Sequence, residues 1–215
     1  MAKRIFVTAT NTDIGKTYTT KLLLKEYASR GLKVGVIKPI ETGVIDNVYP
    51  DGDMLLSLVK KLNPAFKNLN VQDIVPISYS LPAAPFVASN AKKLNINKII
   101  TAIEDLEKLC DVLIIEGAGG LYVPLDEEYM LIDLIKELNA ATLLVTHCSL
   151  GCINDTRLSQ NALETNTVKY ITAFNCKKED EGFATISEPY YIKTKQKVYK
   201  TASDIDTICD VLYNL

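Results

Sequence analysis

Stretches of uninterrupted apolar residues alternate along the chain with longer stretches in which apolar residues recur every three or four positions. The first pattern is typical of a strand buried on both faces, and the second is typical of an amphipathic helix. Strands are predicted at residues 5–9, 33–40, 111–116, 141–146, 169–175 and 198–200, with an edge strand at 74–77. Helices are predicted at residues 16–30, 54–62, 98–109, 129–138, 154–164 and 203–212. This alternation predicts an α/β fold with a mostly parallel central sheet flanked by helices.

Length and composition indicate one domain that covers residues 1–215. No linker-like stretch interrupts the chain, and a hydrophobic share of 47% is enough for a sizeable core. The net charge of −2 gives no electrostatic reason to expect nucleic acid or an anionic membrane as a partner. Because no apolar run reaches the roughly 18 residues of a spanning helix, we expect a cytoplasmic protein.

The turn between the first strand and the first helix has the strongest chemical signal. Gly15, Lys16 and Thr17 match the end of the phosphate-binding pattern G-x-x-x-x-G-K-[ST], although Thr10 occupies its first glycine position. Free N–H groups and the positive end of the helix dipole would hold an anion there. Lys16 would reach the outer phosphates, and the Thr17 hydroxyl would ligate Mg²⁺. An ordinary strand-to-helix turn is the alternative.

Two acidic residues stand at the ends of other predicted elements. Glu116 closes the strand at 111–116 and precedes the glycine-rich residues 117–120. Ligands of open α/β sheets bind at the carboxyl ends of strands, although glycines there can also simply reverse the chain. Asp53 opens the helix at 54–62, where by itself it would be expected to cap free N–H groups.

The cysteines predict neither disulfides nor zinc. Their number is odd and they lack paired C-x-x-C spacing, which favours reduced thiols in the core. Cys148 and Cys152 are four residues apart with His147 beside them, but a metal site there would need more ligands than the neighbouring residues supply. The full set is Cys110, Cys148, Cys152, Cys176 and Cys209.

Five motifs together resemble the dethiobiotin synthetase family in content, order and spacing. They are residues 9–17 (ATNTDIGKT), 38–43 (KPIETG), 52–55 (GDML), 116–120 (EGAGG) and 150–154 (LGCIN). The resemblance extends over about residues 3–176. It implies a three-layer, P-loop NTPase-like fold with a mostly parallel central sheet.

The resemblance also implies a reaction. The family joins 7,8-diaminononanoate to CO2, phosphorylates the resulting carbamate with ATP, and closes a cyclic urea, which gives dethiobiotin, ADP and phosphate in biotin synthesis. Mg²⁺ is the implied cofactor and ATP the co-substrate. A homodimer is also implied, in which the loop at residues 150–154 of one subunit reaches the substrate of the other.

The motif matches assign roles to individual residues by resemblance. Lys16 would neutralise the phosphates, Lys38 would hold the carbamate oxygens, and Mg²⁺ would be ligated by Thr17, Asp53 and Glu116. The implied nucleotide-binding residues are Asp13, Ile14, Gly15, Lys16, Thr17, Tyr18, Glu116, Gly117, Ala118, Gly119 and Asn175. The implied substrate-binding residues are Thr12, Lys38, Thr42, Gly151, Cys152 and Asn154.

The chain departs from the family pattern in three places. The family usually has glycine where this chain has Ala9 and glutamate where it has Asp13. Residues 187–215 do not match the family's base-contacting segment, which leaves the base preference open.

Three other functions are alternatives to a synthetase. A dimerising ATP switch that positions cellular cargo would have a further lysine early in the loop, which residues 10–12 lack. An amidotransferase would require a cysteine and histidine pair, and His147 is the lone histidine. A pure binding module is the remaining alternative.

Overall fold

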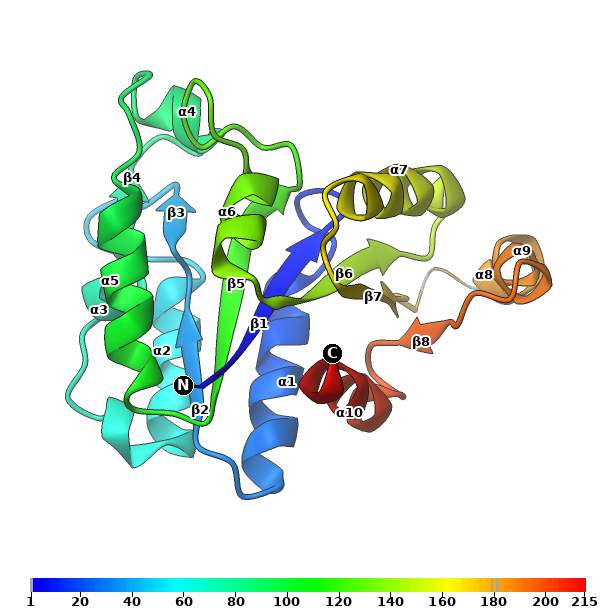
Figure 1. Cartoon of the computed structure of the whole chain (residues 1–215), viewed down its shortest axis with the longest axis horizontal. Coiled ribbons are helices and arrows are strands. Elements are labelled where there is room, and N and C mark those ends of the chain that lie inside the picture. The colour runs from blue at the N-terminus through cyan, green and yellow to red at the C-terminus, as the bar shows by residue number, and fades with distance from the viewer. Residues whose placement is uncertain (1, 179, 181) are drawn as a thin grey trace.

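In the computed structural model, which describes residues 2–178, 180 and 182–215, six parallel strands form the central sheet. Their order across the sheet is β2-β5-β1-β6-β7-β8, so the first strand lies in the middle (Figure 1). The strands are β1 (Lys3–Ala9), β2 (Val34–Ile37), β5 (Val112–Gly120), β6 (Ala141–His147), β7 (Tyr170–Asn175) and β8 (Tyr199–Lys200). The predicted parallel sheet is confirmed.

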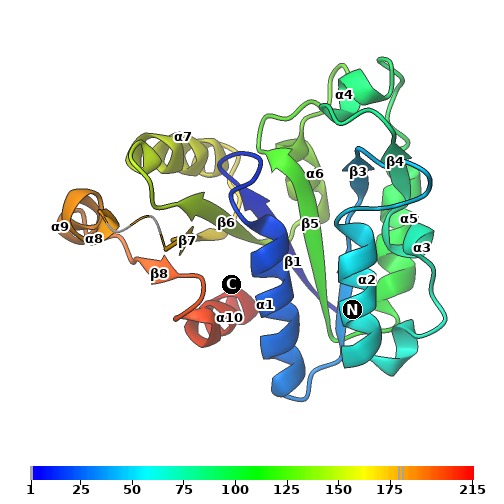
Figure 2. The ribbon, with the colours of Figure 1, turned by 180° about the vertical axis from the view of Figure 1, so that it is seen from behind.

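Helices cover both faces of this sheet and complete three layers. One face is covered by α1, α2 and α10, and the other by α5, α6 and α7 (Figures 1 and 2). These helices are α1 (Lys16–Ser29), α2 (Gly52–Leu62), α5 (Ile96–Glu107), α6 (Leu131–Leu138), α7 (Cys152–Thr165) and α10 (Ile205–Asn214). The short helices are η1 (Pro64–Phe66), α3 (Val71–Ile74), α4 (Pro85–Ala88), α8 (Phe183–Ile186) and α9 (Glu188–Lys193). In the described part of the chain, no helix is long and apolar enough to cross a membrane.

The second predicted strand ends earlier than expected, and a small separate sheet follows it. After β2 the Lys38 N–H donates to the Ile74 carbonyl at 2.8 Å, and Pro39 has no N–H to offer the main sheet. The chain then forms β3 (Ile40–Thr42), which pairs in parallel with β4 (Ile77–Tyr79). The edge strand predicted at 74–77 is therefore wrong in position, because α3 runs through Ile74 and β4 begins where that prediction ended.

The strand β5 is longer than predicted and includes the glycine-rich segment. The main-chain pairing continues past Glu116 to Gly120, which lies opposite Ala9 of β1. Gly117 packs closely against the Phe6 ring, and a Cβ atom there would stand only 2.9 Å from that ring, so the position requires glycine. The segment is thus not a simple reversing turn, and it extends the sheet beside the loop that follows β1.

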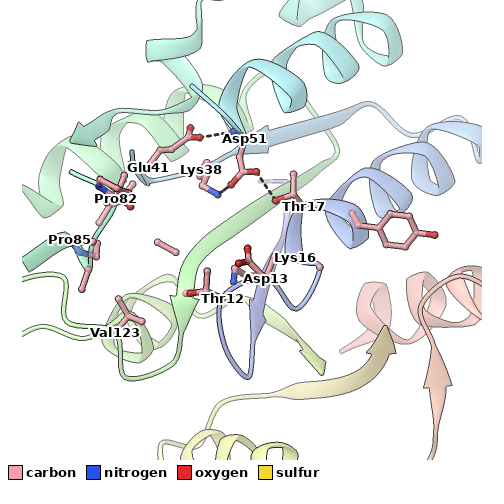
Figure 3. A pocket seen from close by; sticks show the side chains of 18 residues that line it. Thr12, Asp13, Lys16, Thr17, Lys38, Glu41, Asp51, Pro82, Pro85 and Val123 are labelled. Atoms are coloured by element: carbon pink, nitrogen blue, oxygen red, sulfur yellow. Dashed lines mark hydrogen bonds and ion pairs between the residues drawn. The ribbon is translucent and has the colours of Figure 1, made fainter. Parts of the chain in front are cut away.

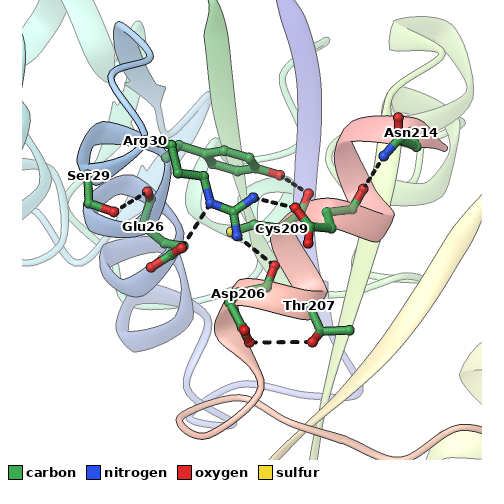
Figure 4. A network of polar contacts seen from close by, with 9 residues as sticks. Glu26, Ser29, Arg30, Asp206, Thr207, Cys209 and Asn214 are labelled. Atoms are coloured by element: carbon green, nitrogen blue, oxygen red, sulfur yellow. Dashed lines mark hydrogen bonds and ion pairs between the residues drawn. The ribbon is translucent and has the colours of Figure 1, made fainter.

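The C-terminal helix α10 is fastened to α1 by polar contacts (Figure 4). The Arg30 guanidinium donates to Asp210 at 2.5 Å and to the Asp206 carbonyl at 2.8 Å. The Tyr27 hydroxyl donates to the buried Cys209 carbonyl at 2.8 Å. Tyr27 and Arg30 lie at the C-terminal end of α1, so these contacts hold α10 against the end of α1 that is farther from the phosphate-binding loop.

Two cysteines contradict the prediction of reduced thiols. Cys148 and Cys176 form a disulfide, with Cα atoms 4.9 Å apart. Their pairing follows from the register of β6 and β7, in which His147 lies opposite Asn175, so that the next residue of each strand is again adjacent. Among the described residues, the remaining cysteines are free thiols, as predicted: Cys110, Cys152 and Cys209.

Candidate active site

A cavity of about 640 Å³ opens at the carboxyl ends of β1, β2 and β5 (Figure 3). The loop after β1 forms one wall, and residues 82–85 with Val123 form the opposite wall. Lys38 and Asp51 lie between these walls. The cavity therefore occupies the place where open α/β sheets bind ligands.

The phosphate-binding loop has the backbone conformation that its sequence requires. Gly15 has φ of 107° and Asp13 has φ of 58°, and glycine and aspartate tolerate this left-handed region better than most residues. The Lys16 side chain is buried, and its Nζ donates to the Asn11 carbonyl at 3.1 Å across the loop. Burial, together with the charge of Lys38, lowers the pKa of Lys16 to about 8. A bound phosphate group would provide a negatively charged partner for this buried ammonium.

Four side chains meet at the base of the cavity. Lys38 Nζ donates to Glu116 Oε1 at 2.9 Å and forms an ion pair with Asp51. The Thr17 hydroxyl lies 3.0 Å from Asp51 Oδ1 and 2.9 Å from Glu116 Oε1, and its single proton can be donated to one of them. We call Thr17, Lys38, Asp51 and Glu116 the polar cluster. It joins the start of α1, after the phosphate-binding loop, to the end of β2 and the middle of β5.

Burial and mutual attraction set the charges in the polar cluster. Burial alone would lower the pKa of Lys38, but the carboxylates of Glu116 and Asp51 outweigh it and raise that pKa above its ordinary value. Burial alone would raise the pKa of Asp51, and the Lys38 ammonium outweighs it in turn, so that this pKa is lowered. At neutral pH the cluster therefore has a protonated lysine.

One oxygen of the polar cluster is left without a partner. Glu116 Oε2 is buried and accepts no hydrogen bond from any described residue. Such an oxygen is unfavourable unless a ligand or cation satisfies it. Thr17, Asp51 and Glu116 also offer the oxygen ligands that Mg²⁺ prefers, so these residues fit that ion. In the described chain, no group of three or more His, Cys, Asp or Glu residues is placed around a metal position.

The structure places Asp53 outside the polar cluster. Its side chain is exposed and accepts a hydrogen bond from the Tyr49 N–H at 2.8 Å, and it does not line the cavity. Asp51, which the sequence analysis missed, stands in the cluster instead. The helix begins earlier than predicted, at Gly52, where Glu41 accepts hydrogen bonds from the N–H groups of Asp51 and Gly52. The ligand set of Thr17, Asp53 and Glu116 stays a prediction; of its three members the structure brings Thr17 and Glu116 together, with Asp51 in contact with Thr17.

Most of the remaining predicted residues lie at the cavity or beside it. Ile14 offers its carbonyl to the Asn175 side chain at 2.8 Å, and Gly117 is enclosed in the sheet. The predicted residues that line the cavity are Thr12, Asp13, Gly15, Lys16, Thr17, Tyr18, Lys38, Thr42, Ala118 and Gly119.

Three predicted substrate residues do not line this cavity within one chain. Gly151, with φ of 99°, precedes α7, and Cys152 is buried at the start of that helix. Asn154 is exposed on its first turn. The adjoining Leu150 is 87% exposed, which leaves the segment accessible from outside the protein.

A second cavity, of about 470 Å³, lies on the other side of Tyr18. It is lined by the end of β7, by residues 176–178 and by residues 200–203. Asn175 belongs to its wall while also contacting the phosphate-binding loop. The sequence analysis could not find this cavity, because residues 200–203 lack a recognisable motif.

Comparisons with known proteins agree with this fold. A family model described as an AAA domain matches residues 3–210. The ATP-dependent dethiobiotin synthetase BioD of Sulfurovum sp. (strain NBC37-1) is 46% identical over 187 residues, which are 87% of this chain and 89% of that protein. The protein of the same name from Wolinella succinogenes is 35% identical over 214 residues, 98% of each chain.

Solved structures show the fold at lower identity. The MinD cell division protein of Aquifex aeolicus has a TM-score of 0.53 at 17% identity, covering 97% of this chain and 86% of that one. A plasmid partition protein from Borrelia burgdorferi has a TM-score of 0.57 at 11% identity, covering 99% and 96%. These likenesses confirm the P-loop NTPase-like fold, and the sequence relatives establish more than the fold: the chain belongs to the ATP-dependent dethiobiotin synthetase family.

Proposed function

We propose that this protein is the ATP- and Mg²⁺-dependent ligase that converts 7,8-diaminononanoate and CO2 into dethiobiotin, with release of ADP and phosphate. Membership of the dethiobiotin synthetase family supports an ATP-dependent role in biotin biosynthesis. The observation that carries the proposal is the polar cluster, in which Lys38 and the phosphate-loop residue Thr17 share the same two carboxylates. A nucleotide and a second, anionic reactant would thus meet in one cavity.

The nucleotide would bind along the phosphate-binding loop. The N–H groups of this loop and the N-terminus of α1 favour phosphate, and Lys16 would pair with the outer phosphates. The base would enter the second cavity, between Tyr18 and residues 200–203, beside Asn175. This chain would therefore recognise the base with a segment of its own where it departs from the family pattern.

Mg²⁺ would be held by Thr17, Glu116 and Asp51. When bound, the ion would neutralise charge on the phosphates during transfer. The unsatisfied Glu116 Oε2 and the two carboxylates around one hydroxyl support this assignment. Asp53 is the weaker candidate because its carboxylate already accepts the Tyr49 N–H.

The substrate would lie against Lys38, Thr12 and Thr42. A carbamate formed from the diamine and CO2 is an anion at neutral pH, so no general base is needed to ionise it. The protonated Lys38 would hold its oxygens and stabilise the charge that develops as it accepts a phosphoryl group. Catalysis would then be mainly positioning and charge stabilisation.

A homodimer would complete the site. Gly151, Cys152 and Asn154 lie away from the cavity of their own chain, on an accessible segment at the start of α7. From a second copy they would reach the substrate carboxylate, where the N-terminus of α7 favours negative charge. The exposed Leu150 beside them would be covered in such a dimer.

Phosphate release tests the proposal. Purified protein should release phosphate from ATP only when Mg²⁺, bicarbonate and 7,8-diaminononanoate are all present, with dethiobiotin formed in equal amount. The rival reading as a cargo-positioning ATP switch predicts release that is indifferent to the diamine. Release without the diamine would therefore overturn the synthetase proposal.

A further inference from the structure

Lys38 occupies the position in which a cation would be expected. Its ammonium contacts Glu116 Oε1 and the Asp51 carboxylate, which are the same groups that the Thr17 hydroxyl contacts. Only 5% of Lys38 is exposed, and Glu116 is fully buried. The two carboxylates are therefore neutralised in part by a lysine that is also the candidate carbamate-binding residue.

The neighbouring charged groups have other partners. Lys16 Nζ is held by the Asn11 carbonyl, on the loop side of the cavity. The Glu41 carboxylate accepts the N–H groups of Asp51 and Gly52. Within the part of the chain that the structure describes, Lys38 is thus the cation that forms ion pairs with Asp51 and Glu116.

An ammonium and a divalent ion would compete for these two carboxylates. Mg²⁺ binds its oxygen ligands at about 2.0–2.1 Å, whereas Lys38 Nζ already lies within hydrogen-bond distance of Glu116 Oε1. Two cations held by the same pair of buried carboxylates repel each other strongly. Binding of the metal would therefore favour movement of the ammonium away from these carboxylates.

We propose that the Lys38 ammonium fills the cation position of the nucleotide-free protein, and that arrival of Mg²⁺ displaces it into the cavity toward the carbamate position. This proposal rests on the function proposed above and deepens it. Lys38 lines the cavity and has a flexible four-carbon stem, so it has room to swing from the carboxylates. The lysine would engage the carbamate only after the metal is in place, which would order the two halves of the reaction.

Binding of Mn²⁺ to the nucleotide-free protein tests the competition directly. Free Mn²⁺ is measured by electron paramagnetic resonance, with neither ATP nor diamine present. Lys38→Met removes the competing cation, and we expect it to bind Mn²⁺ at least tenfold more tightly than the unaltered protein. Lys38→Arg keeps a positive charge at the site and should stay close to the unaltered protein.

Two further variants locate the effect. Lys33→Met removes an exposed lysine at the opposite end of β2 and should leave Mn²⁺ affinity unchanged. Adding Asp51→Asn to Lys38→Met should abolish the gain, because the carboxylate that both cations use is lost. Thermal melting of each variant verifies that it is folded.

Unchanged or weaker Mn²⁺ binding by folded Lys38→Met would overturn the competition. A gain of equal size in Lys33→Met would also overturn it, since the effect would then be one of general charge. The assay contains no substrate and measures no turnover. Its failure can therefore be distinguished from failure of the synthetase proposal, which the phosphate-release experiment tests.

Discussion

Asn175 holds the phosphate-binding loop through the Ile14 carbonyl. Its Nδ2 donates to that oxygen at 2.8 Å, and a Cβ atom added to Gly15 would stand 2.1 Å from the same nitrogen. The close packing is available only because residue 15 is a glycine. The end of β7 thereby fixes a loop that follows β1, two strands away in the sheet.

Replacement of Asn175 by alanine should weaken nucleotide binding without unfolding the protein. Loss of one neutral hydrogen bond that orders the loop should reduce the binding free energy of ATP by about 1 kcal/mol, which corresponds to about fivefold weaker binding. Calorimetric titration with ATP measures the change. Asn166→Ala is the matched control, because it removes a similar bond to the Ala162 carbonyl at the far end of α7. Equal weakening in both variants would contradict a local effect on the loop.

Substitution of Asp51 should change the Mg²⁺ dependence of activity much more than substitution of Asp53. We expect Asp51→Asn to raise the Mg²⁺ concentration needed for half-maximal activity by about tenfold or more, since even groups that only orient metal ligands have effects of that size. Asp53→Asn loses only its bond to the Tyr49 N–H and should stay within about twofold of the unaltered protein. Steady-state rates across a Mg²⁺ series measure both. The reverse order would return Asp53 to the ligand set.

The sequence pattern did not reveal Asp51, which the structure places in the polar cluster near the predicted ligand Asp53. Lys38 and Glu116 could be located because an apolar run directly precedes each of them, and Lys16 because the Gly15-Lys16-Thr17 motif marks the start of α1. The choice between two aspartates depends on the turn at which α2 begins. That turn is fixed by Glu41, whose contact with the helix start no local pattern reveals.

Features that join distant segments were also missed. The Cys148–Cys176 disulfide depends on β6 and β7 being neighbours in register, which hydrophobic periodicity does not specify. The second cavity depends on the pairing of β8 with β7, which brings residues 200–203 beside Asn175 and Tyr18. Both need the order of strands and helices in space, whereas the sequence pattern predicts the elements one at a time.

Lys38→Ala should abolish ring closure while leaving nucleotide binding largely intact. The lysine stands at the end of β2, outside the phosphate-binding loop, and would stabilise charge on the carbamate. Removal of one such donor lowers kcat by about a hundredfold to a thousandfold in other enzymes. Dethiobiotin formation and ATP affinity are measured on the same preparation. Equal loss of both would mean that Lys38 belongs to the nucleotide half of the site.

The pH dependence of ATP affinity should report Lys16. Its pKa is lowered to about 8 in the free protein, chiefly by burial, and the protonated form is the one that pairs with phosphate. Affinity should therefore hold below about pH 8 and decline as the pH rises through that value, by up to about tenfold per pH unit. Binding of ATP is titrated from pH 7 to about pH 9.5. Lys16→Met should bind weakly and without this decline; a decline of the same size in the variant would assign it to another group.

Reduction of the Cys148–Cys176 disulfide should lower the stability of the protein. The bond closes a loop with a sequence separation of 28. Restriction of the unfolded chain by such a loop predicts a stabilisation of the folded state by about 3 to 4 kcal/mol.

Two measurements check the disulfide. Alkylation of the unfolded, unreduced chain should label the three free cysteines, and alkylation after reduction should label all five. Urea unfolding of the unaltered protein should shift to lower concentration when a dithiol reductant is added. The double variant Cys148→Ser, Cys176→Ser should start at the lower value and not respond to the reductant, whereas Cys110→Ser should still respond. Labelling of five cysteines before reduction, with unfolding insensitive to the reductant, would show that the two thiols are not joined.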